Sequence, residues 1–219
     1  MGIRTGTDDA FKTRDLFERE ITALKSIGHP HVPCYIDSFA EDFHGEERLY
    51  LVMEHVNGKN LAQIVKEQRI NLDRVMNIAK QVTNILSYLQ EFTPPIVHRD
   101  IKPDNLIETP DGKIKLIDFG SVNDAIAQGT RRTWTSVGTA GFAAPEVLLG
   151  KAFPASYIYS LGCTLVYLLS GGADIAREFT NDDHRLDFRG KLNLPAELEA
   201  LLMRMTEPNV KRRIQTAEE

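Results

Sequence analysis

Four polar side chains with the chemistry to handle a phosphate lie within one stretch of this sequence, residues 97–120. Asp100, Lys102 and Asn105 are spaced two and three residues apart, and a second aspartate, Asp118, follows near the end of the stretch. A carboxylate can accept the proton of a hydroxyl group, and a lysine can neutralise charge on a phosphate. An amide oxygen and a second carboxylate suit Mg²⁺, which prefers oxygen ligands and accompanies phosphates. Together these groups indicate phosphoryl transfer.

The elements that must position these side chains can be predicted from the residues between them. Residues 106–108 and 113–117 favour extended chain, and the letters TPDG between them are typical of a tight turn. Two strands joined in this way form an antiparallel hairpin, with the strands about 4.8 Å apart. Asn105 and Asp118 then lie at its open end, where their oxygen atoms can converge on one cation.

Three motifs occur in a fixed order: HRDIKPDN at residues 98–105, DFG at 118–120 and APE at 144–146. They resemble the catalytic loop, the metal-binding motif and the end of the activation segment of protein kinases. One of them alone would be weak, but the ordered set is specific. The stretches LFEREITALKSIGHPHVPCYIDSF, FPASYIYSLG and HRLDFRGKLNLP also resemble a bacterial, cyanobacterial-type branch of serine/threonine kinases.

The resemblance implies an α+β, bilobal kinase-like fold, with a small β lobe at residues 1–56 and a mainly helical large lobe at residues 57–219. It implies ATP and Mg²⁺ as cofactors. It also implies a protein serine or threonine as the acceptor, because the tyrosine-specific pattern lacks a lysine at the position of Lys102.

The resemblance also assigns roles to individual residues. Asp100 is expected to position the acceptor hydroxyl and take its proton, and Lys102 is expected to steady the γ-phosphate of ATP. Asn105 and Asp118 are expected to hold Mg²⁺ on ATP. Structural or regulatory roles are implied for Glu20, His98, Arg99, Phe119, Gly120, Thr139, Glu146 and Arg213.

Some of these implied roles are specific contacts. We expect His98 to pack against Phe119 rather than to act as an acid or base. Thr139 is expected to bridge Asp100 and Lys102, and Arg213 to pair with Glu146. If that pair is buried between segments, breaking it from one side is costly.

The activation segment carries hydroxyl groups after a basic pair. Thr133, Thr135 and Ser136 follow Arg131 and Arg132. The arginine before the catalytic aspartate resembles that of kinases whose segment is ordered by phosphorylation, through new bonds to arginine. A plain surface role for these hydroxyls fits the sequence equally well.

The small lobe is predicted to begin with a helix at residues 15–27, which the letters GHP then end. By resemblance it is helix αC, in which Glu20 would pair with a lysine of the third strand; the alternative is a solvent-exposed acid. Strands are predicted at 32–39 and 48–56, with a polar turn at 41–47.

The end of the second strand resembles the hinge between kinase lobes. Met53 then occupies the gatekeeper position, or simply packs in the core. The backbone from Glu54 to Val56 is expected to contact the adenine ring, because backbone groups fix ligand orientation in such pockets.

The large lobe is predicted to contain three main helices. The longest covers residues 72–92, with an apolar face and Asn71 as its N-cap. The others cover residues 157–169 and about 195–205, the last with Leu198, Leu201, Leu202 and Met205 on one side.

Composition agrees with a globular domain that works inside the cell. The 219 residues carry 26 basic and 31 acidic side chains, a net charge of −5, and 42% are hydrophobic. This balance does not indicate a nucleic-acid partner. The apolar stretch at 161–169 is too short to span a bilayer, and the N-terminus lacks a signal-peptide pattern. We therefore expect a cytoplasmic protein with ATP and a protein substrate as partners and no membrane segment.

One departure from the kinase pattern concerns the small lobe. In the family the glycine-rich loop and the strand lysine precede αC. The lysine usually lies nineteen residues before the glutamate, and counting back nineteen residues from Glu20 reaches Met1. The small lobe is therefore expected to be truncated to αC and two strands, with an exposed sheet edge. We expect weak ATP binding and little or no turnover from this chain. The alternative to an active kinase is an impaired pseudokinase or kinase fragment that acts as a binding or scaffold module.

A second departure is Tyr157, which stands where the family usually has an aspartate. That aspartate accepts backbone N–H bonds from the catalytic loop. A tyrosine cannot act as a carboxylate acceptor, and buried donors left unpaired cost about 1–3 kcal/mol each.

Overall fold

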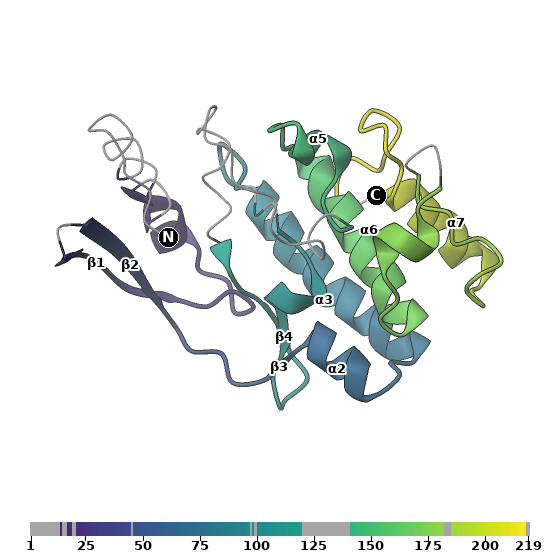
Figure 1. Cartoon of the computed structure of the whole chain (residues 1–219), viewed down its shortest axis with the longest axis horizontal. Coiled ribbons are helices and arrows are strands. Elements are labelled where there is room, and N and C mark those ends of the chain that lie inside the picture. The colour runs from purple at the N-terminus through teal and green to yellow at the C-terminus, as the bar shows by residue number, and fades with distance from the viewer. Residues whose placement is uncertain are drawn as a thin grey trace.

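The computed structural model describes residue 14 and residues 17–18, 21–44, 46–96, 98, 100–119, 141–181 and 185–217. Residues 21–26 are helical. The named elements that follow are β1 (Tyr35–Phe43), β2 (Glu46–Met53), β3 (Lys59–Asn60), α2 (Leu61–Glu67), α3 (Leu72–Gln90), η1 (Pro103–Asn105), β4 (Leu106–Glu108), β5 (Ile114–Leu116), α5 (Pro145–Leu148), α6 (Pro154–Ser170), the π-helix η3 (Ile175–Phe179) and α7 (Ala196–Met205). Figure 1 shows the β ribbon and the helix of residues 21–26 on one side of the molecule and the named helices on the other. This is an α+β, kinase-like arrangement.

The first sheet is a two-stranded antiparallel ribbon of β1 and β2. The strands run on until Phe43 pairs with Glu46, so the turn predicted at 41–47 was too long. Cross-strand backbone bonds hold these polar residues in the ribbon, where most of their side chains are exposed, and strand formation there does not need an apolar pattern. β2 ends at Met53 rather than at the predicted residue 56, because the chain must leave the ribbon to reach the second sheet.

The second sheet has the order β3-β4-β5. The predicted hairpin is confirmed as β4 and β5, and Gly112 in its turn has a φ of +78°. The third strand, β3, pairs with β4 and was not predicted, because two residues carry no periodic signal. Gly58 allows this pairing, since a Cβ atom there would lie 2.3 Å from the Glu108 carbonyl oxygen.

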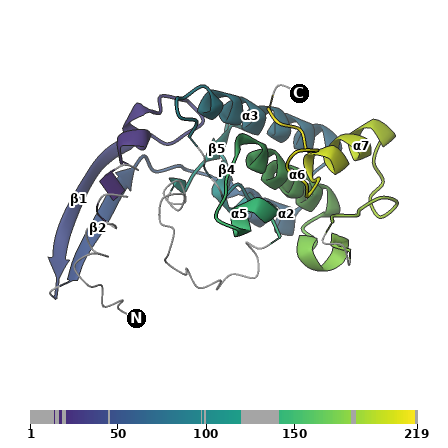
Figure 2. The same cartoon turned by 90° about the horizontal axis from the view of Figure 1, so that it is seen from above.

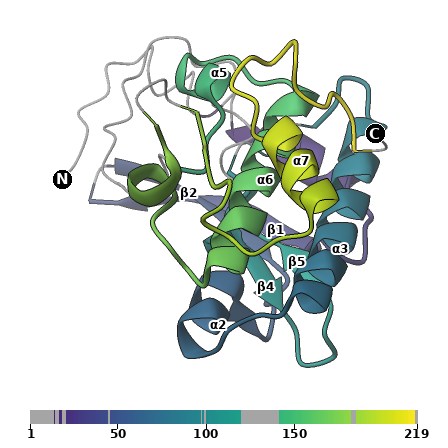
Figure 3. The same ribbon diagram turned by 90° about the vertical axis from the view of Figure 1, so that its right-hand side faces the viewer.

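α3 packs on β5 of this sheet, and α6 packs between α3 and α7 (Figure 3). The predicted N-cap of α3 is confirmed, because the Asn71 side chain accepts a bond from the Arg74 N–H at 2.9 Å. α6 begins at Pro154, three residues before its predicted start. Proline suits the first turn of a helix, where its missing N–H is not needed. Gly171 ends α6 in the left-handed conformation.

The buried face of α7 differs in part from the predicted one. Leu202 is fully buried, whereas Leu201 is 37% exposed. Adjacent helical positions differ by about 100° around the axis, so both could not face one core. Among the helices in the described ranges, none combines the length and the apolar character needed to cross a membrane.

The two sheets are joined by the segment at residues 28–34 and by the link between β2 and β3. The Leu116 N–H donates to the His31 carbonyl at 2.9 Å, and the Gly28 N–H donates to the Tyr88 hydroxyl at 2.9 Å. Figure 2 shows the ribbon extending away from the helices, with β4 and β5 between the two parts. The division at residues 56 and 57 remains a prediction.

Candidate active site

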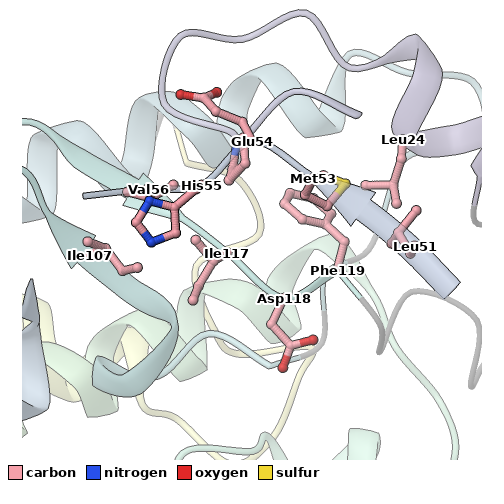
Figure 4. A pocket seen from close by; sticks show the side chains of 11 residues that line it. Leu24, Leu51, Met53, Glu54, His55, Val56, Ile107, Ile117, Asp118 and Phe119 are labelled. Atoms are coloured by element: carbon pink, nitrogen blue, oxygen red, sulfur yellow. The ribbon is translucent and has the colours of Figure 1, made fainter. Parts of the chain in front are cut away.

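A pocket of about 550 Å³ lies between the two sheets. Residues 53–56 form one wall and residues 117–119 form another (Figure 4). The rest of the apolar lining is Leu24, Pro33, Leu51 and Ile107. Ligand pockets usually measure about 300–1,000 Å³ and combine apolar walls with a few polar groups. The pocket is therefore large enough for a nucleotide.

The predicted hinge residues Met53, Glu54 and Val56 all line this pocket. The carboxylate of Glu54 bonds to Lys115 Nζ at 2.6 Å and accepts from the Cys34 N–H at 3.1 Å. The bond from Lys115 is the main reason why the pKa of Glu54 is lowered. Figure 4 shows this carboxylate pointing away from Asp118. The side chain is thus engaged elsewhere, which suits a hinge that recognises its ligand through the backbone.

The role of Lys115 could not be predicted from the sequence. This lysine lies on β5, 61 residues from Glu54, and no local pattern connects the two. The apolar residues Leu24, Leu51 and Ile107 of the pocket were also missed. Their only signal was that they flank or lie within the predicted elements.

The predicted catalytic-loop residues are brought together by the short turn η1. Lys102 Nζ lies 2.7 Å from Asp100 Oδ2. Asn105 Nδ2 donates to the same oxygen at 2.9 Å and to the Asp100 carbonyl at 2.8 Å. Within the described part of the chain both side-chain contacts fall on Oδ2, so Oδ1 is the better placed oxygen for a substrate hydroxyl.

Asp118 lies beside this turn because of the hairpin. The Ile117 N–H donates to the Asn105 carbonyl at 2.9 Å, which places the following residue next to Asn105. Asp118 has a φ of +65°, a region that residues other than glycine rarely adopt. Backbone strain of this kind is often found at functional sites. Figure 4 shows the Asp118 carboxylate pointing away from Ile117 and Phe119.

The donor set fits Mg²⁺. The Asn105 amide nitrogen makes both of its bonds to Asp100, so the amide oxygen is the atom suited to a cation. The exposed carboxylate of Asp118 supplies a second type of oxygen. Mg²⁺ is usually held by one or two carboxylates, with water and substrate phosphates completing its shell.

His98 connects the backbone before Asp118 to the backbone of Asp100. Its side chain is fully buried, and its ring meets Phe119 edge-on with 4.6 Å between centroids, as predicted. Nε2 lies 3.0 Å from the Ile117 carbonyl, and Nδ1 accepts from the Asp100 N–H at 3.4 Å. Burial lowers the pKa of His98 from 6.5 to about 4. A neutral, enclosed imidazole acts as a scaffold between the two aspartates rather than as an acid or base.

Stability should therefore depend on the ionisation of His98. Between pH 4 and 6.5 the unfolded state binds more protons at this residue, so its contribution to stability increases with pH and is complete above about 6.5. Acidification to pH 4 should remove about 3 kcal/mol of this contribution. We expect chemical unfolding of the wild type and His98→Phe to show it as a difference that changes with pH. A difference independent of pH over this range would contradict the lowered pKa.

The predicted pair between Glu146 and Arg213 is present. Two bonds of 2.6 and 3.0 Å join the guanidinium to the carboxylate, and Ser156 Oγ donates to the same carboxylate at 2.6 Å. Burial alone would raise the pKa of Glu146, but the bonds from Arg213 and Ser156 lower it overall. This network connects α5 and α6 to the C-terminal segment.

Four of the predicted site residues, Glu20, Arg99, Gly120 and Thr139, lie outside the described residues. The same holds for the basic pair and hydroxyl groups at 131–136. Tyr157 is described: it is buried in α6, and its hydroxyl donates to the Ile96 carbonyl.

Comparisons with known proteins agree with this geometry. Residues 4–219 match the protein kinase domain. Serine/threonine-protein kinase B of Synechocystis sp. is 34% identical over an alignment of 231 positions, which covers 99% of this chain and 39% of that protein. Serine/threonine-protein kinase PknA of Mycobacterium tuberculosis is 36% identical over 168 residues, which cover 75% of this chain and 38% of that protein. The chain thus spans less than half the length of these relatives.

Proposed function

Because this chain belongs to the protein kinase family, we propose that it transfers the γ-phosphate of ATP to a serine or threonine hydroxyl of a protein. One observation carries this proposal: the side chains of Asp100, Lys102 and Asn105 are joined by contacts of 2.7 to 2.9 Å beside the pocket that Asp118 lines. The names of the related serine/threonine kinases support the choice of acceptor.

Different residues of the chain would have different roles in the reaction. The backbone of residues 54–56 would orient the adenine ring at one end of the pocket, and Asp118 and Asn105 would hold Mg²⁺ at the other end. When bound, Mg²⁺ would neutralise charge on the phosphates. Asp100 Oδ1 would accept the proton of the substrate hydroxyl, while the bond from Asn105 fixes the orientation of the carboxylate.

Lys102 would steady the γ-phosphate. Its Nζ lies 2.7 Å from Asp100 Oδ2, so a phosphate that it contacts is also held near the carboxylate. Holding reacting groups in this way supplies much of the rate enhancement in phosphoryl transfer, which depends on positioning and charge stabilisation.

Asp100→Asn tests this assignment, because the amide keeps the shape of the side chain but cannot accept the proton. We expect phosphate transfer to serine and threonine peptides to fall about 100- to 10,000-fold. The affinity for MgATP should change little, because Asp100 is assigned no contact with the nucleotide. Transfer of radiolabelled phosphate and calorimetry measure the two effects separately.

Asp111→Asn is the matched control. Asp111 is exposed in the turn at the far end of the hairpin, so transfer and binding should both remain as in the wild type. Equal transfer by the wild type and Asp100→Asn would contradict the proposed role of Asp100. A folded wild-type chain that does not bind MgATP would instead favour a binding module with a kinase fold.

A further inference from the structure

Tyr157 occupies a position from which α6 contacts the chain that leads into the catalytic loop. The residue is only 1% exposed, and its hydroxyl donates a hydrogen bond to the Ile96 carbonyl. A buried tyrosine hydroxyl needs such a partner, because leaving it unbonded away from water is costly. The contact joins residues 61 positions apart in the sequence.

The backbone of Ile96 is held from both sides. Its N–H donates to the Leu89 carbonyl of α3 at 3.1 Å, and its carbonyl accepts from Tyr157 of α6. The two helices pack against each other (Figure 3). The segment before the catalytic loop is therefore held between the two helices by the hydrogen bonds of one residue, Ile96.

From Ile96 the restraint reaches both aspartates of the site. His98 follows two residues later, and its two ring nitrogens contact the Asp100 N–H and the Ile117 carbonyl. Ile117 directly precedes Asp118. A shift of Ile96 would therefore move His98 and change the distance between the loop and the hairpin.

We propose that Tyr157 is a positioning residue that fixes the position of the catalytic loop relative to α6 through its bond to the Ile96 carbonyl. In the kinase pattern the aspartate at this position accepts hydrogen bonds from backbone N–H groups of the catalytic loop. Tyr157 instead donates a hydrogen bond to a backbone carbonyl, that of Ile96. The contact stands on its own, but its consequence for nucleotide binding rests on the function proposed above.

Tyr157→Phe tests the proposal, because it removes the hydroxyl and keeps the buried ring. The Ile96 carbonyl loses a partner in a buried site, so the local backbone should open more often. We expect hydrogen exchange of the Ile96, Asp100 and Asn105 amides to become faster, on the order of tenfold. MgATP affinity should fall by about the same factor, because Asn105 moves with the loop. Adenosine affinity should stay unchanged, because residues 53–56 do not depend on this contact.

Tyr159→Phe is the control, since it removes a second buried hydroxyl from the same helix. Its ring centroid lies 4.9 Å from the Arg213 guanidinium. Among the described residues, the side-chain hydrogen bond to residue 96 comes from Tyr157 and not from Tyr159. Exchange of the three amides and the ratio of MgATP to adenosine affinity should remain as in the wild type.

Two outcomes overturn the proposal. Equal exchange rates in Tyr157→Phe and Tyr159→Phe would show that the hydroxyl does not hold the loop. Loss of the whole fold in Tyr157→Phe alone would make the contact a folding requirement rather than a positioning one. If the wild type does not bind MgATP, the proposed function fails, and the exchange measurement still decides the role of Tyr157.

Discussion

Replacing Asp118 with alanine should lower the affinity of this chain for MgATP by about 100-fold or more, since changes even in the second shell of a metal site cost about 10- to 100-fold. The exposed carboxylate of Asp118 lies next to Asn105 at the edge of the pocket, and it is the charged oxygen ligand of the proposed site. Calorimetry with ATP in the presence and absence of Mg²⁺ measures the effect. The variant should lose the dependence on Mg²⁺ and keep its affinity for adenosine.

Asp111→Ala at the opposite end of the same hairpin separates this effect from a general loss of negative charge. That variant should bind MgATP like the wild type, because Asp111 is exposed and lies away from the pocket. If Asp118→Ala bound MgATP as tightly as the wild type, Asp118 would not be a ligand of the metal.

Replacing Arg213 with methionine should lower the free energy of unfolding by about 3–5 kcal/mol, the usual cost of removing one partner from a buried ion pair. The Arg213 side chain is 0% exposed and that of Glu146 is 10% exposed. Methionine keeps much of the side-chain volume but leaves the Glu146 carboxylate buried without its cation. Unfolding in urea at neutral pH measures the change.

Arg189→Met provides the comparison. Arg189 also makes two bonds to a carboxylate, that of Asp187, but its side chain is 62% exposed. Exposed pairs contribute about 0–1 kcal/mol, so this variant should lose little stability. Combining Arg213→Met with Glu146→Gln should recover part of the loss, because no buried charge then remains. Equal losses for Arg189→Met and Arg213→Met would show that burial does not decide the cost.

Much of the geometry of the candidate site could be predicted because it is local. The spacing from Asp100 to Asn105 fits into one turn, and the TPDG turn returns the chain so that Asp118 reaches the same end of the hairpin. Asn71 begins α3 through a bond to a residue three positions later. Each of these features depends on turn geometry or hydrogen bonds within a few residues, which side-chain type and spacing specify directly.

Elements that depend on distant partners could not be predicted in the same way. β3 has two residues and exists only because β4 lies beside it, and the ribbon of β1 and β2 extends through polar residues because the strands pair. The exposure of Leu201 was also decided by packing, since the sequence alone gave it the same apolar character as the buried Leu202.

The sequence by itself therefore determined which residues carry the proposed chemistry, namely the two aspartates, the lysine and the asparagine, and the local turn and hairpin that position them. The tertiary structure alone decided how these groups are held. The bond from Lys115 to Glu54 fixes the wall of the pocket, and the bond from Tyr157 to Ile96 anchors the catalytic loop; each joins residues 61 positions apart. Contacts at such separations form only when packing brings whole elements together, so no local periodicity reports them.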